Sequence, residues 1–564
     1  MKKKALLMLV ALLLTLGMVV LTSCGSNDDD PPAQDAVEAT PAPPPEVDDE
    51  PEVEELPEDW VPETGENLVL PLTTEPVLFT VWGAEGGSFD SGLERLSDSD
   101  FYQELMRRTG VTIEWMHPPT GGEQENLNLL IAAGDLPDVL NIMGTGGGAG
   151  MLQGGMSTAI AEGYILDVTE LVHRYAPYYW ELIHADDLRR RWAFTDEGML
   201  PGFWQVNTPV QPPWYGLITR GDWLDELGIS MPITFDDWEE ALLRMKNELG
   251  ATAPFLLGPN GFAGFFQSFN QGFGTVPGFY QVDGEVRFGP MGENFREYVE
   301  MLSRWYSLGI IDPDFMSAPA WATPDHMTTT GIAGLFHHMH VMIPVLGMIS
   351  PDPDFRAVPV PPPVRTPGQA VHLGQLNPLT EWIMLITDQN PDPVLWTRLM
   401  NYLYSPEGTI LANWGVYGVH HEINPDDGLP QFNAFMYDNP DGWTLHNVQR
   451  RYTRMPSGGW AYNHQREDRV PGDGPILIEA AAVWATNTDF AWQMPPVTLT
   501  AAEGAENSRI MTDVNTYRDE MVARFITGIE PMENWDNFIN TLRGMDIERS
   551  IAIHQDALDR FNAR

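Results

Sequence analysis

The feature that most constrains this chain is its single cysteine, Cys24, which directly follows an apolar N-terminal stretch. Lysines occupy positions 2–4, and an apolar run then extends from residue 5 to about residue 21. A positive start, an apolar stretch and small residues before a cleavage point are typical of a secretory signal. A secreted chain with one cysteine has no internal disulfide, so a hydrophobic core alone must stabilise its fold. Roughly 500 residues follow the cysteine, enough for more than one domain.

The four residues Leu21-Thr22-Ser23-Cys24 resemble the bacterial lipobox, in which the cysteine is lipidated and becomes the new N-terminus. We therefore expect residues 1–23 to be a lipoprotein signal peptide and Cys24 to carry the lipid. Each buried CH₂ of an acyl chain contributes about 0.8 kcal/mol, so two or three chains hold such a protein stably on a membrane. The alternatives are an uncleaved signal anchor, because a run of ~17 apolar residues is close to the length that spans a bilayer, or an accidental thiol.

Residues 24–65 are predicted to form a disordered linker. Positions 25–60 contain 14 Asp or Glu, 8 Pro and no Lys or Arg, a composition that buries too little apolar surface to fold. The whole chain is also acidic: its net charge is −49, and removal of the three signal lysines makes it −52. Such a surface repels phosphate backbones, so we expect no nucleic-acid partner, and anionic membranes repel it too.

Strand and helix patterns alternate from about residue 77 onward. The segments 77–84, 111–116 and 138–143 read as strands from their β-branched and aromatic content, whereas 101–108 and 123–133 have helical spacing. This alternation predicts α/β units with parallel strands. The same helical spacing predicts further helices over 235–249, 293–309, 392–405 and 407–415, and around 506–527, 532–543 and 546–562.

Several longer stretches resemble the extracellular solute-binding proteins of ABC importers, specifically family 1, the large lipoprotein-type carbohydrate branch. The stretches are "LNLLIAAGDLPDVLNI" (127–142), "YILDVTELVHRYAPYYWEL" (164–182), "WYGLITRGDWLDELGISMPITFDDWEEALLRMK" (214–246), "LYSPEGTILANWGVYGVHHEI" (403–423) and "FITGIEPMENWDNFINTLRGMDIERSIAIHQDALDRF" (525–561). The third is the most specific. The resemblance rests on the order in which these five stretches follow one another behind the lipobox.

The resemblance implies a periplasmic-binding-protein-like fold over 66–564, with two discontinuous α/β lobes, a hinge and a ligand cleft between the lobes. We expect lobe 1 to comprise about 76–185 and 325–385, and lobe 2 about 186–324 and 386–564. The chain is then expected to cross between the lobes near 186–216, 320–330 and 370–390.

Aromatic residues are the candidates for ligand contact, because indole and phenol rings suit the flat C–H faces of sugars and polar groups fix their orientation. Trp82 ends the first predicted strand, where α/β folds place ligands, and Glu85 follows it as an acceptor for hydroxyl groups. Asp138 recurs in the family pattern, although an Asp at a strand start is often a turn or capping residue.

The other candidates lie in predicted loops. Trp204, Trp214 and Tyr215 cluster near an expected crossing, Trp321 lies in a Pro/Ala loop, and Trp460 follows paired glycines that let a backbone approach a ligand closely. For every one of these rings the alternative is ordinary core packing.

No metal or other cofactor is expected. Many members of this branch have a calcium-binding loop after the helix equivalent to 235–249, but 250–261 here lacks the carboxylates of a Ca²⁺ shell. The histidines of "HHMH" (337–340) and "HH" (420–421) match no metal-site spacing, because neighbouring side chains point in different directions. A Gly-x-Ser-x-Gly motif and a phosphate-binding loop are both absent from the sequence.

The sequence thus predicts a non-enzymatic, monomeric protein on the outer face of the cytoplasmic membrane. It would capture an oligosaccharide or similar polar solute and deliver it to the permease subunits of an ABC transporter. A peptide-binding importer component and a secreted polysaccharide-degrading enzyme are the two alternatives, the second because paired carboxylates suffice for glycoside hydrolysis.

Overall fold

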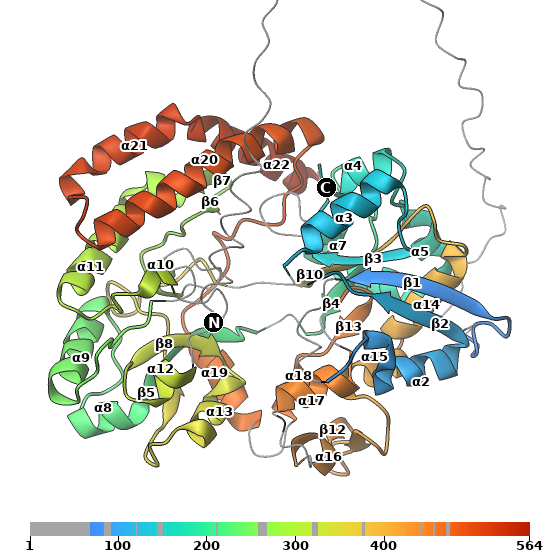
Figure 1. Cartoon of the computed structure of the whole chain (residues 1–564), viewed down its shortest axis with the longest axis horizontal. Helices are drawn as coiled ribbons and strands as arrows, with labels where there is room; N and C mark the ends of the chain where they lie inside the picture. Colours follow the sequence, from blue (N-terminus) through green and yellow to red (C-terminus); the bar gives the residue numbers. More distant parts are fainter. Residues whose placement is uncertain are drawn as a thin grey trace, which may run out of the picture. The chain divides into compact units, whose positions relative to one another are not determined.

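Two main β-sheets, each with its own hydrophobic core, organise the chain (Figure 1). The computed structural model describes residues 68–83, 92–119, 121–143, 151–152, 154–209, 212–257, 268–317, 325–374, 378–438, 443, 445–454, 457–469 and 474–564. These residues all belong to one compact unit. Cys24 and the predicted linker lie outside the described residues.

The first sheet has six strands in the order β13-β4-β10-β3-β1-β2. Their bounds are β1 Val77–Gly83, β2 Val111–Met116, β3 Val139–Met143, β4 Phe203–Asn207, β10 Leu379–Ile386 and β13 Trp460–Tyr462. β1 pairs in parallel with β2 and β3, which confirms the three predicted parallel strands, and β10 is antiparallel to β3 and β4. β2, at one edge of the sheet, alternates buried and exposed residues along its length, whereas every residue of β4, which lies between β13 and β10, is buried.

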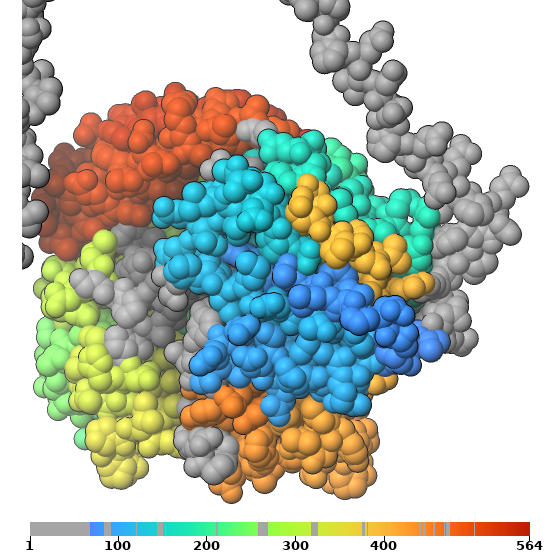
Figure 2. All heavy atoms as spheres, turned by 45° about the vertical axis from the view of Figure 1, so that its right-hand side comes forward, coloured from blue at the N-terminus to red at the C-terminus, as the bar shows by residue number. Residues whose placement is uncertain are grey.

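Helices cover this sheet and complete the first core. They are α2 Asp100–Thr109, α3 Glu123–Ala133, α4 Gly155–Ala161, α5 Thr169–Tyr175, α6 Pro177–Ile183, α7 Asp187–Ala193, α14 Pro393–Tyr404 and α15 Pro406–Trp414. Ser99 caps α2 at its start, and Gly110 ends it in the left-handed conformation. α17 contacts α2, so the blue and orange segments adjoin in Figure 2.

The first core includes segments that we expected in the second lobe. Leu399, Leu403 and Leu411 of α14 and α15, and Trp460 of β13, all pack in the first core, although lobe 2 was expected to hold 386–564. The helical spacing of these segments shows that they have an apolar face, but it does not show which of two cores that face joins.

The second sheet has three antiparallel strands in the order β8-β5-β9, with bounds β5 Tyr215–Arg220, β8 Leu335–Met339 and β9 Ala357–Pro359. One core packs around Leu217 on one face, and a smaller cluster packs around Ile218 on the other. The helices on this side are α8 Gly221–Leu227, α9 Phe235–Glu248, α10 Ser268–Gln271, α11 Glu293–Ser307, α12 Asp325–Thr329, α13 Met342–Ile349 and α19 Gly474–Trp484.

Local signals in the sequence explain where two of the long helices begin. The Thr234 hydroxyl accepts from the backbone N of Asp237 at 3.1 Å, and the Thr234 backbone N donates to the Asp237 carboxylate at 2.8 Å, so the capping box predicted for α9 is confirmed. Thr500 and Glu503 form a second capping box at the start of α20.

Three C-terminal helices, α20 Ala501–Ile526, α21 Trp535–Gly544 and α22 Ile547–Ala563, pack with one another, and α20 also packs on α11 (Figure 1). All three were predicted, although α20 begins earlier than expected. The remaining elements are η3 Leu96–Asp98, β6 Phe279–Val282, β7 Glu285–Phe288, η4 Gly289–Met291, η5 Phe315–Ser317, β11 His421–Ile423, β12 Pro430–Phe432, α16 Ala434–Tyr437, α17 Leu445–Tyr452, α18 Gln465–Asp468 and η6 Met532–Asn534. Every helix among the described residues is too short or too polar to span a lipid bilayer.

Within the part of the chain that the structure describes, successive elements change from one sheet to the other at three places. The chain leaves the first sheet after β4 and enters the second at β5, returns between β9 and β10, and leaves again after β13 toward α19. The crossing expected near 320–330 is wrong, because β5 and β8 on either side of it belong to the same sheet. The crossing after β13 was not predicted.

A buried ion-pair cluster joins the C-terminal helix to the loop after α7. Arg560 Nε and Arg564 Nε each donate to the Asp196 carboxylate at 2.8 Å. The side chains of Asp196 and Arg564 are only 9% and 4% exposed. Arg564 also donates to the carbonyl oxygens of Arg191 and Phe194. We call these three side chains the Asp196 cluster.

Replacement of Asp196 is expected to destabilise the protein, because it leaves a buried guanidinium without its counter-charge. We predict that Asp196→Asn lowers the free energy of unfolding by about 2–4 kcal/mol, measured by urea denaturation. The matched control is Asp187→Asn on the adjacent helix, whose carboxylate is 64% exposed and pairs with Arg190 and Arg191. The control should change stability by less than about 1 kcal/mol, and equal effects of the two variants would contradict the role of the cluster.

A second prediction concerns pH. The guanidinium of Arg107, hydrogen-bonded at 2.7 Å, and that of Arg108 lower the pKa of Glu104 to about 2. Because this folded-state pKa lies below that of the unfolded chain, the interaction stabilises the fold above about pH 4.5 and is lost as the pH falls toward 2. The difference in unfolding free energy between wild type and Glu104→Gln should therefore be about 1 kcal/mol at pH 7 and vanish near pH 2. A difference that stays constant over this range would contradict the prediction.

Candidate functional site

The chain crossings meet at the carboxyl end of β4. The backbone N of Asn207 donates to the carbonyl of Pro378, just before β10, at 3.0 Å. The next residue, Thr208, donates to the carbonyl of Tyr462 at the end of β13 at 2.8 Å. Asn207 thus connects the three segments of the first sheet that lead to or from the second sheet.

Side chains complete this junction. Asn207 is fully buried, its Oδ1 lies 3.0 Å from His464 Nε2, and its carbonyl oxygen accepts from Arg189 Nη2 at 3.1 Å. A buried amide of this kind is stable only while its hydrogen bonds are made, so the junction has one preferred geometry. We call Asn207, Thr208, Tyr462 and His464 the crossing junction.

On the second sheet, the crossing from β4 arrives at Trp214 and Tyr215. The Trp214 carbonyl accepts from the backbone N of His340 at 3.0 Å, and the two aromatic rings lie 6.0 Å apart. The Tyr215 ring stacks on His337 at 6.2 Å. Burial raises the pKa of the Tyr215 hydroxyl and lowers the pKa of His337 to about 3, so both groups are neutral at physiological pH.

The return crossing pairs with the segment after α19. Val371 exchanges backbone hydrogen bonds with Asn487 and Asp489, both at 2.8 Å. His372 Nδ1 lies 2.9 Å from the Asp489 carboxylate, and its ring lies 4.7 Å from Trp492. The backbone N of Ala491 and then His372 lower the pKa of Asp489, which keeps the carboxylate ionised. Trp214 and Trp492, both half-buried, are therefore aromatic rings held beside two of the crossings.

The carboxyl end of β1 forms part of the same edge of the first sheet as the ends of β3 and β4. Trp82 is 1% exposed, and its indole N–H donates to Asn126 of α3 at 2.8 Å. His117, just after β2, lies with Nδ1 3.1 Å from the Gly83 carbonyl. A Cβ at Gly83 would lie 2.5 Å from the Trp115 ring, so only glycine fits here. Open α/β sheets bind ligands beyond this edge.

The structure places several predicted ligand contacts in the core instead. Trp204 is 4% exposed and donates to the Ala193 carbonyl, and Trp460 is fully buried and donates to the Ser457 carbonyl. Both rings therefore follow the packing alternative. Asp138 accepts from the backbone N of Thr80 at 2.6 Å and from its hydroxyl at 2.8 Å, so it connects β3 to β1.

Of the remaining predicted residues, Trp214 and Tyr215 lie together where β5 begins. Trp82, at the carboxyl end of β1, is 1% exposed and packs in the first core, so it too follows the packing alternative. Glu85 and Trp321 lie outside the described residues. Sequence reasoning missed Asn207, His372, His464 and Trp492 as members of the candidate site, since no local pattern marks a residue whose partner is more than a hundred positions away.

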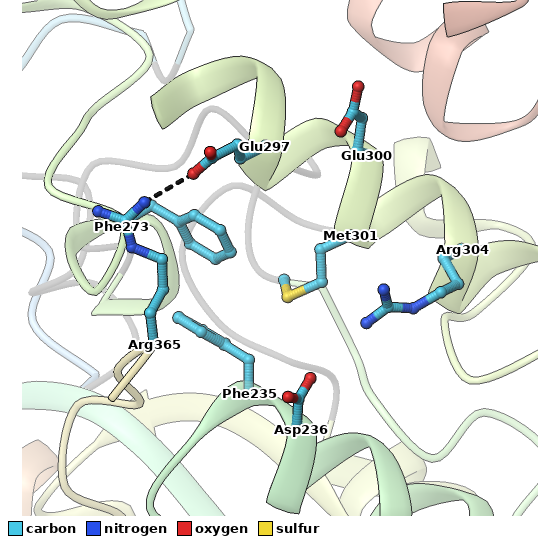
Figure 3. A pocket seen from close by; sticks show the side chains of 8 residues that line it. All are labelled: Phe235, Asp236, Phe273, Glu297, Glu300, Met301, Arg304 and Arg365. Atoms are coloured by element: carbon cyan, nitrogen blue, oxygen red, sulfur yellow. Dashed lines mark hydrogen bonds and ion pairs between the residues drawn. The ribbon is translucent and has the colours of Figure 1, made fainter. Parts of the chain in front are cut away.

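A cavity of about 330 Å³ lies elsewhere, between α9 and α11 (Figure 3). It is lined by Phe235, Asp236, Phe273, Glu297, Glu300, Met301, Arg304 and Arg365. Its two arginines are already paired, Arg365 with Glu297 at 2.6 Å and Arg304 with Glu239 at 2.7 Å. Phe235 and Phe273 are each only 5% exposed, so neither ring offers a face on which a sugar could stack.

The described residues contain no group of three His, Cys, Asp or Glu side chains placed to hold a metal ion. His337 and His338 are successive residues of β8, so their side chains point to opposite faces of the sheet. His338 lies 3.4 Å from Asp325, and His420 lies 3.3 Å from Asp100.

Comparison with known proteins agrees with this architecture. The sequence profile described as bacterial extracellular solute-binding protein matches residues 91–410. The chain is 22% identical over 510 residues to the fructooligosaccharide ABC transporter substrate-binding protein FusA of Streptococcus pneumoniae, covering 82% of this chain and 87% of that protein.

Solved structures show the same fold. The alginate-binding protein AlgQ2 without calcium ion has a TM-score of 0.69 at 22% identity, over 86% of this chain and 99% of that one. An HMO-binding ABC-transporter-associated solute-binding protein from Bifidobacterium longum infantis has a TM-score of 0.68 at 15% identity, with the same coverage. The predicted α/β, periplasmic-binding-protein-like fold class is thereby confirmed. Because the family profile covers more than half of the sequence, the chain belongs to the bacterial extracellular solute-binding proteins.

Proposed function

We propose that this protein captures an oligosaccharide between its two sheets and delivers it unchanged to the permease of an ABC importer. Family membership supports a solute-binding role, and FusA, a relative across most of the chain, is named for fructooligosaccharides. The observation that carries the proposal is the pair of half-buried rings, Trp214 beside the first crossing and Trp492 beside the return crossing. Aromatic rings next to hydrogen-bonding groups are the combination that binds sugars.

The mechanism follows from the connectivity. Two bodies joined by crossing segments can rotate about those segments, and a ligand that contacts both bodies favours the closed arrangement through its higher affinity for that arrangement. In this proposal, each lobe consists of one of the two sheets together with the hydrophobic core that packs on it. The closed surface is then what the permease distinguishes from the empty protein.

The tether belongs to the same proposal. Cys24 would carry the lipid on the outer face of the cytoplasmic membrane, and the acidic linker to about residue 65 would hold the folded part above it. Tethering raises the effective concentration of loaded protein at its permease. We further propose that the protein has no catalytic activity, acts as a monomer and needs no metal; peptide binding and glycan hydrolysis are the alternatives that the experiments below separate.

Binding without turnover is the first expectation. Purified protein should show saturable calorimetric binding to members of a fructooligosaccharide and plant-glycan panel, and none to a peptide panel. A bound ligand raises the free energy of unfolding by RT ln(1 + [L]/Kd), so the melting temperature should rise with the same glycans only. Chromatography of the glycan after overnight incubation should recover it intact. Binding of peptides alone, or shortened glycan products, would contradict the proposal.

The tryptophan beside the return crossing supplies a second test. Trp492→Ala should weaken oligosaccharide binding at least about tenfold, because it removes an aromatic contact worth roughly 1–2 kcal/mol. Trp180→Ala is the matched control, since that half-buried ring packs on His184 of the first-sheet side at 4.1 Å. Its affinity should stay within about twofold of wild type. Equal affinities for all three proteins would remove Trp492 from the site.

A further inference from the structure

Exposed apolar side chains gather in one short segment of the first-sheet side, residues 416–438. Six of the nineteen large apolar side chains that are exposed among the described residues occur there: Tyr417 (64%), Val419 (46%), Ile423 (42%), Leu429 (50%), Phe435 (38%) and Tyr437 (42%). The segment contains the β11–β12 hairpin and α16, which lie side by side in Figure 1. We call its exposed surface the hairpin patch.

Hydrogen bonds and ring contacts hold the parts of this segment together. The hairpin pairs Ile423 with Pro430, so the residues at its tip lie together. The Asn433 side chain donates to the Val419 carbonyl at 2.9 Å, which holds the start of the hairpin against the start of α16. The Tyr417 ring lies 5.6 Å from that of His421. Exposed apolar side chains that gather on one ordered segment mark an interaction site more often than singly scattered ones do.

The patch rests on a rigid support. Phe432 and Met436, on the inner side of the same segment, are fully buried in a small core with Trp414. His420 is also buried: its Nδ1 accepts from the backbone N of Val416 at 3.0 Å, and its Nε2 lies 3.3 Å from Asp100 of α2. A surface that is already ordered loses little entropy when a partner binds.

The charge of the segment restricts the kind of partner. Residues 416–438 contain four carboxylates and no Lys or Arg. Asp427 pairs with Arg469 at 2.9 Å, whereas no arginine or lysine among the described residues lies within ion-pair distance of Glu422, Asp426 or Asp438. The complementary surface is therefore apolar at its centre and basic at its rim. An anionic lipid surface and a second copy of this acidic chain would both be repelled.

We propose that the hairpin patch is a docking surface for a protein partner with an apolar centre and a lysine- or arginine-rich rim, on the outward face of the importer's permease. This inference rests on the proposed function, which supplies such a partner. The apolar side chains give the contact its affinity, and the unpaired carboxylates raise its association rate and make it sensitive to salt.

The test measures docking and sugar binding separately. The permease is reconstituted in lipid nanodiscs, and the protein, both ligand-free and with oligosaccharide, is passed over them in a surface-binding assay. Empty nanodiscs with anionic lipids and immobilised copies of the protein itself serve as the other two surfaces. Wild type should bind the permease nanodiscs, and this binding should weaken as salt rises; binding to empty nanodiscs or to itself of equal strength would overturn the proposal.

Two variants locate the contact. Tyr417→Ser/Leu429→Ser should weaken permease binding at least tenfold while its oligosaccharide affinity and melting temperature stay near wild type. Glu422→Gln/Asp426→Asn, which keeps every apolar side chain, should weaken binding at low salt and flatten the salt dependence. The matched control is Val69→Ser/Ile529→Ser, at side chains that are 74% and 67% exposed elsewhere.

The outcomes separate this inference from the proposed function. Permease binding by all three variants at wild-type strength overturns the docking surface, whatever the sugar results are. Loss of binding in the patch variants but not in the control supports it. If calorimetry shows that wild type binds no oligosaccharide, the proposed function is wrong. The nanodisc experiment with ligand-free protein still decides whether the hairpin patch contacts the permease.

Discussion

The buried hydrogen bonds at Asn207 are the constraint on which the rest of this architecture depends. They connect the ends of β4 and β13 and the start of β10, and each of these segments leads to or from the second sheet. Buried backbone groups must stay paired, so the chain cannot separate these segments without a large cost. The hinge of the proposed mechanism would lie at this bundle of crossings.

Contacts away from the junction also join the two sides of the chain. The Asp196 cluster fixes α22 to the loop after α7 through two arginines on one buried carboxylate. Few side chains in this acidic protein carry positive charge, and lysine occurs only at positions 2–4 and 246. Arginine serves such a cluster well because its planar fork donates several hydrogen bonds at once. The segment that forms the hairpin patch, in contrast to the Asp196 cluster, contains no arginine.

Much of the fold was predictable because its signals are local. The parallel strands β1, β2 and β3, the helices α9 and α11 and the Thr234 capping box all follow from spacing and residue type within a short window. The assignment of α14 and α15 to the first core was not predictable from the residues, since an apolar helix face fits either core. The crossing after β13 was missed for the same reason: β13 is short, and only its pairing with β4 shows which sheet it joins.

The site was harder to predict than the fold. A tryptophan in a loop between strands has the same local sequence whether it packs in a core, as Trp204 and Trp460 do, or lies half-buried beside a crossing, as Trp214 and Trp492 do. His372 meets Asp489, and Asn207 meets His464, across separations that no spacing rule covers. Family resemblance supplied the class of ligand, and the three-dimensional pairing supplied the candidate residues.

A crystal structure of the protein with a bound oligosaccharide tests the central claim most directly. We expect one intact glycan in contact with side chains from both sheets, near the carboxyl edge of the first sheet and near Trp214 and Trp492 of the second. A glycan held by one side alone, such as in the cavity beside Phe235 and Phe273, or a cleaved product, would contradict the account.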